Sequence, residues 1–502
     1  MATSLLCETV TGRTMAELLA ARDNATHGDM VELRLDGVAG LDVAGALRGR
    51  RSPVVVTCRP TWEGGRFEGS EESRSRILDR ALEGGAEFVD VEWRAVSQSS
   101  GAGFTEVLRR DPVRVVVSSH DFDGVPVDLD DRVRAMRSLG AGAIKVAVMA
   151  SRLTDTLPLK RIAAEGDAIV IGMGEAGVPS RLLAAHYGSR WTYAGSGVAP
   201  GQMPAERMAD DFHFFRVEST TRIFGVVGTN ALHSLSPVMH NAAFEAGGID
   251  AVYVPLRAAS FEDFLSYASA MGIEGASVTI PFKLDALRAA NRSSSLTQSV
   301  GAANTLRRDG DGWEATNTDV EGFLAPLDAV FGARLRGARA AVLGAGGAAR
   351  AVVAALVARG SLVTVYARRP EQAQDLARSF GADHGEWPPS PGSWDVLVNC
   401  TPVGGAGQRE ESPLSREDVA GPLVYDLTYG MGSSALLRNA RAAGCLTIDG
   451  LPMLIAQAER QFEWWTGQRP EPGVMADALR RRINVSAETD TRATETRRHG
   501  VH

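Results

Sequence analysis

The amino-acid sequence predicts an α/β protein, with a closed (β/α)8 barrel followed by a two-domain half that contains a Rossmann-type sheet. Two observations support this prediction. From Met1 to about Val217, short β-branched runs alternate with longer helical patterns, as in parallel sheets covered by helices. Near residue 344, a glycine-rich turn separates a strand pattern from an Ala-rich helix pattern, as in βαβ units of doubly wound sheets.

Eight strand-like runs are expected in the first half. A closed barrel would gather the carboxyl ends of these strands at one mouth, where the chemistry of such barrels lies. A doubly wound open sheet is the structural alternative. The expected strands are Ser4–Glu8, Met30–Arg34, Val54–Cys58, Glu87–Glu92, Arg114–Ser118, Ala143–Met149, Ala168–Met173 and Trp191–Ala194.

Composition limits the functional classes. The chain has 502 residues, and about 150 residues per domain suggests three domains. Lys+Arg 53 against Asp+Glu 61 gives a net charge of −8, which argues against a nucleic-acid partner. Cys7, Cys58, Cys400 and Cys445 show no metal-binding spacing, so no metal and reduced thiols in the cytoplasm are expected. No apolar run of about 18 residues and no targeting pattern is seen, so no membrane association is expected.

A single lysine stands out inside a predicted strand. Lys145 lies in the middle of GAGAIKVAVMA, a run of small and β-branched residues that is typical of a strand buried on both faces. Either its stem is buried while its amine reaches a rim, or burial and neighbouring cations hold the amine uncharged so that it can attack a ketone and form a Schiff base.

Charged residues at the other strand ends favour the second interpretation. Arginines, a histidine and a lysine that converge on a barrel mouth describe a site for a small anionic carbonyl compound. The residues at or just after the strand ends are Glu32, Arg34, Arg59, Glu63, Glu92, His120, Arg181 and Gln202.

The motifs ELRLD, TCRPTWEGGRFEGSEE, SSHDF, IKVAVM, MGEAGVPSR and APGQ together resemble type I 3-dehydroquinate dehydratase. The resemblance covers the first half in order. It implies that Lys145 forms an imine with 3-dehydroquinate, that His120 acts as general acid and base, and that Glu63 orients His120. It further implies a set of substrate contacts, with Glu32, Arg34 and Arg59 at the ring hydroxyls and Arg181 with Gln202 at the carboxylate.

One position departs from that family, which usually has serine where Val198 stands. The missing hydroxyl removes one hydrogen bond to the carboxylate, or about 1 kcal/mol. Ser196 is a candidate to compensate. The departure leaves open an impaired barrel.

The polar stretch Glu218–Arg222 is the expected boundary, and Arg222–Val227 begins a new strand. Pro237 suits a helix start, and Ser234 and Ser236 before it could simply cap that helix. A DGDG turn predicts a hairpin with Asn304 and Asp319 on its two sides.

The turn at Gly344, Gly346 and Gly347 lies between a strand and a helix, as a pyrophosphate-binding loop requires. The next strand pattern ends at Arg368 and Arg369 rather than at an acid. Arginines there favour the 2′-phosphate of NADP over the ribose hydroxyl of NAD.

The second half resembles shikimate dehydrogenase along its length, in HSLSPVMHN, SVTIPFK, GAANTL, TNTDVEGF, LGAGGAAR, VNCTPVG, YDLTYG and DGLPMLIAQA. The resemblance implies a catalytic pair, Lys283 and Asp319. It implies substrate contacts from Ser234, Ser236, Thr279, Asn304, Tyr429 and Gln457. It implies NADP contacts from Gly344, Ala345, Gly346, Gly347, Ala348, Arg368, Arg369 and Thr401. In this family asparagine often precedes the NADP-binding arginine, where this chain has Ala367.

The expected organisation is a dehydratase barrel (1–218), a substrate-binding domain (222–330, completed by 451–483), an NADP-binding domain (331–450) and a disordered tail (484–502). We expect dehydration of 3-dehydroquinate to 3-dehydroshikimate, then reduction to shikimate by NADPH. The alternatives are a dehydrogenase preferring quinate or NAD, a barrel that is only a binding module, and, less favoured, a Schiff-base aldolase.

Overall fold

The computed structural model describes residues 3–97, 102–405, 408–430 and 432–485. It divides into two compact units, one of residues 1–223 with 251–272, the other of residues 224–250 with 273–502. The expected disordered tail from residue 486 onward lies outside the described residues, whereas Asn484 and Val485 end a helix.

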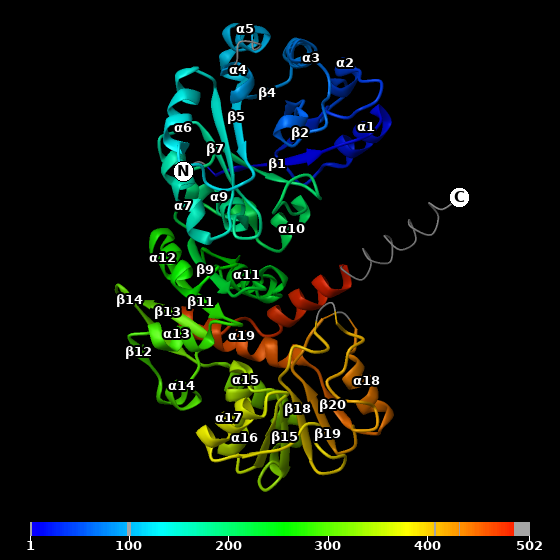
Figure 1. The fold of residues 1–502 in the computed structure, drawn as a ribbon, viewed down its shortest axis with the longest axis vertical. Coiled ribbons are helices and arrows are strands. Elements are labelled where there is room, and N and C mark those ends of the chain that lie inside the picture. The colour runs from blue at the N-terminus through cyan, green and yellow to red at the C-terminus, as the bar shows by residue number, and fades with distance from the viewer. Residues whose placement is uncertain (1–2, 98–101, 406–407, 431, 486–502) are drawn as a thin grey trace, which may run out of the picture. The chain divides into compact units, whose positions relative to one another are not determined.

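The first unit is built on an eight-stranded parallel sheet (Figure 1). Its strands are β1 (Leu5–Val10), β2 (Met30–Arg34), β3 (Val54–Thr57), β4 (Phe88–Glu92), β5 (Val115–Asp121), β6 (Ala143–Met149), β7 (Ala168–Met173) and β8 (Trp191–Ala194). Its main helices are α1 (Met15–Asn24), α2 (Val43–Leu47), α3 (Glu71–Glu83), α4 (Trp93–Ser97), α5 (Ala102–Arg110), α6 (Leu129–Ser138), α7 (Leu157–Ala164), α8 (Val178–Leu182), α9 (Ala184–Tyr187) and α10 (Ala205–Asp210).

The strand order confirms the barrel. Strands run consecutively from β7 down to β1, and β1 then pairs with β8. Hydrogen bonds from Arg190 N–H to the Ala168 carbonyl (2.9 Å) and from Val170 N–H to Ser189 Oγ (3.1 Å) link the two remaining edges. A doubly wound sheet would reverse its strand order partway, so the open-sheet alternative is wrong.

Alternation along the strands decides which side chains enter the barrel. An apolar cluster inside it includes Cys7, Val116, Ala143 and Trp191. On β6 the inward positions are Ala143, Lys145 and Ala147, so the lysine points into the barrel between two small residues. Hydrophobic residues thus fill the amino-terminal end of the barrel, and polar residues fill its middle and mouth.

The second unit contains a mixed sheet with the order β9-β11-β13-β14-β12, and the expected hairpin is β13–β14. The strands are β9 (Arg222–Val227), β11 (Ile273–Val278), β12 (Arg292–Ser293), β13 (Thr305–Asp309) and β14 (Gly312–Thr316), and the helices are α11 (Ser236–Ala246), α13 (Lys283–Ala289), α14 (Ser295–Val300) and α15 (Asp319–Phe331). The segment with β10 (Ala251–Leu256) and α12 (Phe261–Met271) groups with the first unit.

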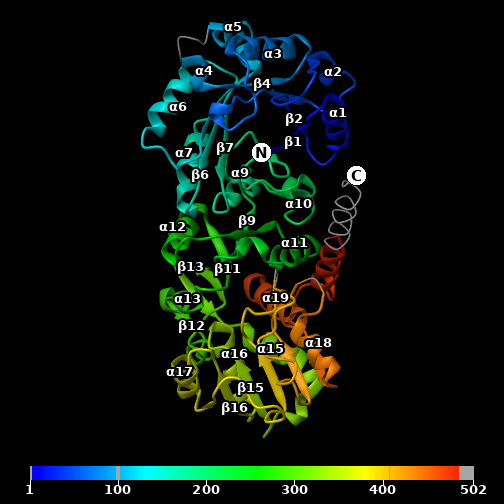
Figure 2. The same ribbon diagram turned by 45° about the vertical axis from the view of Figure 1, so that its right-hand side comes forward.

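A six-stranded parallel sheet follows, in the order β17-β16-β15-β18-β19-β20, with helices on both faces (Figure 2). This confirms the Rossmann-type sheet. Its strands are β15 (Arg339–Leu343), β16 (Leu362–Tyr366), β17 (Asp383–His384), β18 (Val396–Asn399), β19 (Leu423–Asp426) and β20 (Leu446–Ile448), and its helices are α16 (Gly347–Ala358), α17 (Pro370–Phe380) and α18 (Ala435–Ala442).

The last long helix, α19 (Gly450–Thr466), returns to the mixed sheet. Phe462 lies 5.4 Å from Phe244, and Trp465 lies 5.3 Å from Phe224, between ring centroids. The Trp465 indole N–H donates to the Leu306 carbonyl (2.9 Å). The aromatic residues of this helix therefore pack the core, as the sequence indicated.

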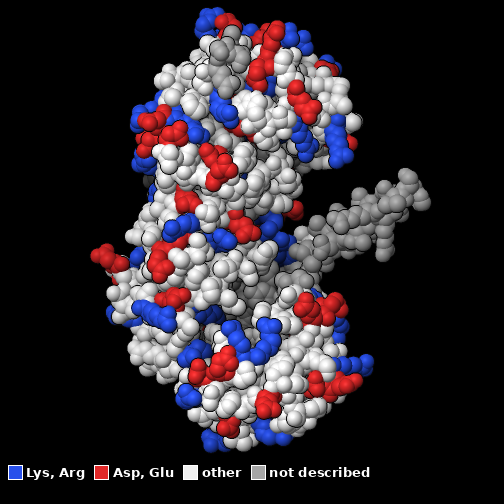
Figure 3. Space-filling model, in the orientation of Figure 1, with Lys and Arg blue, Asp and Glu red and all other residues white. Residues whose placement is uncertain are grey.

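Figure 3 shows acidic and basic side chains interspersed over the face it presents. Among the described residues, no helix combines the length and the apolar character needed to cross a bilayer.

Candidate active sites

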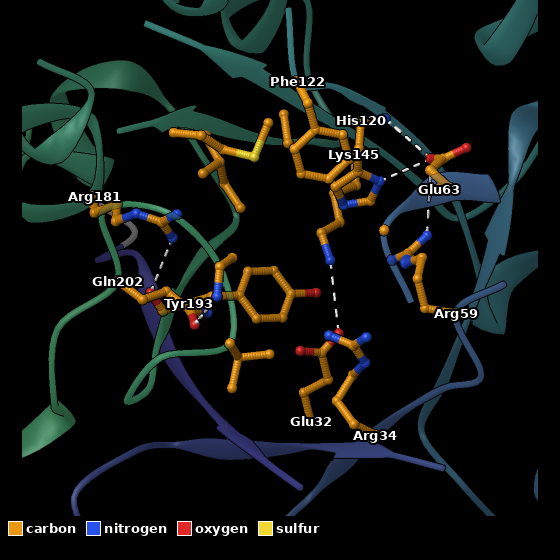
Figure 4. A pocket seen from close by; sticks show the side chains of 16 residues that line it. Glu32, Arg34, Arg59, Glu63, His120, Phe122, Lys145, Arg181, Tyr193 and Gln202 are labelled. Carbon is orange, nitrogen blue, oxygen red and sulfur yellow. Dashed lines mark hydrogen bonds and ion pairs between the residues drawn. The ribbon is translucent and has the colours of Figure 1, made fainter. Parts of the chain in front are cut away.

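A cavity of about 570 Å³ opens at the carboxyl ends of the barrel strands. Figure 4 shows its lining side chains pointing toward one another from several strands. It brings together every site residue expected in the first half, along with Val198. The expected residues that line it are Glu32, Arg34, Arg59, Glu63, His120, Lys145, Arg181 and Gln202.

Lys145 is 4% exposed and its amine faces this cavity. Nζ donates to Asp90 Oδ2 at 3.1 Å and lies 3.7 Å from Glu32 Oε1. Sequence analysis expected arginines around this amine. The structure shows that its nearest charged groups are carboxylates instead, because strand register places β4 and β2 side chains beside it.

His120 and Glu63 form a hydrogen-bonded pair. Glu63 Oε1 lies 2.9 Å from His120 Nδ1 and accepts the His120 backbone N–H at 3.0 Å. Burial raises the pKa of Glu63 to about 7, although the nearby Arg59 opposes this rise. Burial, followed by the charges of Arg59 and Lys145, holds the pKa of His120 well below its usual range. The imidazole is therefore neutral, with Nε2 left for a substrate.

The backbone beside this pair requires a glycine. Glu63 ends a short 3-10 turn (Thr61–Glu63), and Gly64 follows with φ of 77°. A Cβ at Gly64 would lie 2.9 Å from the Phe122 ring. His120 itself was expected just after the fifth strand but lies inside β5, which extends to Asp121.

A buried charge network lies behind the lysine. Arg59 pairs with Asp90 (3.1 Å) and Glu92 (2.7 Å), and Arg74 from α3 also pairs with Glu92. Burial alone would raise the pKa of Asp90, but Arg59 and Lys145 outweigh burial and lower it. Sequence analysis missed Asp90 and Arg74. The alternation in VDVE could have revealed Asp90, because it shares the inward face with Glu92.

Arg181 presents a different environment. It is 1% exposed and donates to the carbonyls of Tyr193 (3.2 Å) and Pro200 (3.3 Å). Within the described residues it has no carboxylate partner, and its Nε has no hydrogen bond. Burial lowers its pKa to about 10. A buried, unpaired guanidinium is costly, so this position is built for an anionic ligand.

The loop after β8 completes this end of the cavity. Gln202 Oε1 accepts the Ala199 N–H (3.1 Å), and its Nε2 donates to Thr9 Oγ1 (3.4 Å). Val198 lines the cavity, whereas Ser196 is exposed and outside the lining. The described geometry therefore gives Ser196 no role in replacing the serine that the family usually has.

In the second unit, Lys283 Nζ donates to Asp319 Oδ2 at 2.5 Å. Asn304 Nδ2 donates to Asp319 Oδ1 (2.8 Å) and lies 3.3 Å from Gln457 Oε1. Lys283 begins α13 and Asp319 begins α15. The structure thus brings together four of the residues expected at this site.

The remaining expected substrate contacts lie nearby in the chain but form no direct hydrogen bond with that pair among the described residues. Ser236 is the first residue of α11, and its N–H donates to Ser234 Oγ at 3.2 Å. The Thr279 methyl group packs against Gly228, where a Cβ would lie 2.3 Å away. Burial raises the pKa of Tyr429.

The glycine-rich turn adjoins the catalytic lysine. Gly344 has φ of 105°, and Gly346, before α16, has open space around it and no side-chain cap. The first N–H groups of α16 are therefore available to a phosphate. A Cβ at Gly347 would lie 2.9 Å from Lys283 Cδ, so this glycine lets the lysine stem approach the turn.

Other expected cofactor residues surround this turn. Ala345 and Ala348 are half-buried within it, and Thr401 donates to Asn399 Oδ1 from both its N–H (3.0 Å) and its Oγ1 (2.7 Å). Arg368 and Arg369 follow β16, are exposed, and have no ion-pair partner within the described part of the chain. These features fit NADP.

Family models match both halves. The model for type I 3-dehydroquinase matches residues 6–218, that for the shikimate dehydrogenase substrate binding domain matches residues 226–306, and that for the shikimate 5′-dehydrogenase C-terminal domain matches residues 450–480.

Curated relatives agree. The bifunctional 3-dehydroquinate dehydratase/shikimate dehydrogenase (chloroplastic) of Arabidopsis thaliana is 31% identical over 92% of this chain and 82% of its own length. The shikimate dehydrogenase (NADP(+)) of Methanocella arvoryzae is 42% identical over 51% of this chain and 98% of its own length. A crystal structure of a shikimate dehydrogenase in complex with NADP+ matches with a TM-score of 0.50 and 31% identity, over 53% of this chain and 97% of that one.

Fold, cavity and comparisons together define a two-site enzyme, in which a lyase barrel is joined to an NADP-dependent oxidoreductase. The chain belongs to the family of bifunctional 3-dehydroquinate dehydratase/shikimate dehydrogenases.

Proposed function

We propose that the barrel dehydrates 3-dehydroquinate to 3-dehydroshikimate through an imine on Lys145, and that the second half reduces this product to shikimate. One observation carries the first step. A single cavity holds a buried amine, a neutral histidine oriented by a carboxylate, and a buried arginine without an acidic partner. These are a nucleophile, a base and an anion anchor for one small carbonyl acid.

Arg181 binds the substrate carboxylate in this proposal. The guanidinium fork suits a carboxylate, and the low dielectric of a buried site strengthens the contact. The anchored substrate presents its ketone to Lys145. Glu32 and Arg34 remain the candidates for the ring hydroxyls. Arg59 is occupied by Asp90 and Glu92, so its role is to set charge rather than to bind substrate.

Lys145 Nζ, once its amine is unprotonated, attacks the ketone carbon, and loss of water from the adduct leaves a protonated imine. His120 Nε2 then removes a proton from the neighbouring carbon, and the positive nitrogen takes up the electron pair. His120 returns that proton to the leaving hydroxyl, which departs as water. Addition of a second water to the imine releases the enone and restores Lys145.

In the second half, bound NADPH supplies the hydride. Lys283 is placed to hold a proton at the carbonyl oxygen being reduced, and Asp319 fixes the position of the Lys283 amine through their 2.5 Å contact. Asn304 and Gln457 orient Asp319 or the substrate hydroxyls. Arg368 and Arg369 would hold the 2′-phosphate, and the turn at Gly344–Gly347 would hold the pyrophosphate.

The functional boundaries that we propose are a barrel over 1–218, a substrate domain over 222–330 completed by 451–483, and a cofactor domain over 331–450. We also propose a cytoplasmic location, which is supported by four cysteines that form no disulfide.

Borohydride reduction in the presence of 3-dehydroquinate tests the barrel chemistry. A stable adduct should map to the peptide that contains Lys145, and the matched lysines Lys160 and Lys283 should stay unmodified. Enone absorbance should grow without any nicotinamide. No adduct and no enone would instead favour a barrel that only binds. Initial rates with shikimate and quinate, each with NADP and NAD, test the dehydrogenase preference.

A further inference from the structure

One aromatic residue in the barrel cavity has no role in the mechanism above. Tyr193 lies on β8, two residues after the buried Trp191, so both side chains point into the barrel. Tyr193 is 2% exposed and lines the cavity beside Lys145 and Glu32. Figure 4 shows its phenol projecting toward the end of the Lys145 side chain. The centroid of its ring lies 4.0 Å from Lys145 Nζ.

We propose that Tyr193 is a further residue of the dehydratase site, whose ring face holds the Lys145 nitrogen in place and stabilises the cationic imine. This inference rests on the proposed imine chemistry. An aromatic face attracts a cation at this separation. The protonated imine carries its charge on the same nitrogen, so the ring would stabilise it as it stabilises the ammonium.

The surroundings of the lysine show why a support is needed. The inward neighbours of Lys145 on β6 are Ala143 and Ala147, which are too small to confine a flexible four-carbon stem. Asp90 and Glu32 attract Nζ at 3.1 and 3.7 Å. The ring of Tyr193 provides a further contact surface, so the nitrogen is held by the ring as well as by the carboxylates.

The backbone of the same residue serves the other end of the site. The Tyr193 carbonyl accepts a hydrogen bond from Arg181, the proposed carboxylate anchor. A side-chain substitution leaves this carbonyl in place. Changes at Tyr193 should therefore alter the chemical step at the nitrogen and spare substrate binding at Arg181, which separates kcat from KM.

Two substitutions and a control test the proposal. Y193L removes the ring, and Y193F keeps it. F88L removes a ring that packs 5.1 Å from Trp191 in the same barrel core but does not line the cavity. We expect Y193L to lower the kcat of dehydration about tenfold, which corresponds to about 1.4 kcal/mol, with KM within about twofold. Y193F and F88L should keep kcat within about threefold.

The steady-state fraction of enzyme trapped by borohydride should also fall in Y193L and recover in Y193F. Unchanged kcat and trapping in Y193L would overturn the proposal, and so would an equal loss in F88L, which would indicate general damage to the barrel. Thermal unfolding and the dehydrogenase rate of each variant check folding. If the wild-type chain forms no adduct, the proposed imine chemistry fails; if it does and Y193L matches it, only this inference fails.

Discussion

The two active-site regions handle buried charge in different ways. In the barrel, Lys145 lies among Asp90, Glu32 and Arg59, and all four side chains are at most 5% exposed. In the second unit, a single ion pair joins Lys283 to Asp319, and neutral amides supply the neighbouring contacts. The barrel site is a connected network of charges, whereas the second site is one pair beside a glycine-rich turn.

This difference follows from architecture. A closed sheet leaves no solvent for inward side chains, so each buried charge must be matched by another within the ring. The second site places its pair at the first residues of α13 and α15, next to a turn that is open to a phosphate group. We therefore expect substitutions in the barrel to affect several neighbouring groups, and substitutions in the second site to act on one step.

The largest effect should come from the isolated pair. K283M should lower the kcat of shikimate dehydrogenation about 10³-fold, because the proton at the carbonyl oxygen loses its donor. Following nicotinamide absorbance measures this rate. The dehydratase rate of the same protein is the internal control and should stay within about twofold. A loss smaller than about tenfold would show that the pair is structural.

The barrel anchor should give the next largest effect. R181M should raise the KM for 3-dehydroquinate about 100-fold, since a charge-assisted bond in a buried site contributes roughly 1.5–3 kcal/mol. R181K should fall between, because lysine cannot form the fork. R190M, which changes an arginine that does not line the cavity, should leave KM unchanged. Equal effects of R181M and R190M would argue against an anion anchor.

The histidine pair predicts a pH dependence. When Glu63 is ionised it accepts the His120 Nδ1–H and leaves Nε2 as a base; when Glu63 is protonated that orientation is lost. Because the pKa of Glu63 is raised to about 7, dehydratase kcat/KM should rise with pH through about 7. It should be about tenfold lower at pH 6 than on the plateau.

E63Q keeps the shape of the side chain and removes this titration. Its profile should be flat across that range, at a lower plateau. An acid limb that stays unchanged in E63Q would assign the limb to another group.

The smallest effect should be at the exposed arginines. R368A should raise the KM for NADP about tenfold and leave that for NAD unchanged, because only NADP carries the 2′-phosphate. R369A tests the neighbouring side chain. R359A, on the same sheet's first helix and ion-paired with Asp328, is the matched control. The measurement is the ratio of kcat/KM for the two cofactors, and no change in that ratio would remove both arginines from the phosphate site.

The sequence alone determined much of the barrel. Four predicted strands, among them Met30–Arg34 and Ala143–Met149, match the structure to the residue. Both periodicity and β-branched runs are local properties, so they are legible without the fold. The family motifs likewise pointed to eight residues that line one cavity. The glycine-rich turn was predicted because its conformation depends on a few adjacent residues.

Only the tertiary structure decided which charges meet. Asp90 and Tyr193 lie far from Lys145 in the chain and reach it through strand register and barrel closure. The same register placed carboxylates, rather than the expected arginines, beside the amine. Neighbours across a sheet depend on how separate strands align, and no short stretch of sequence encodes that alignment.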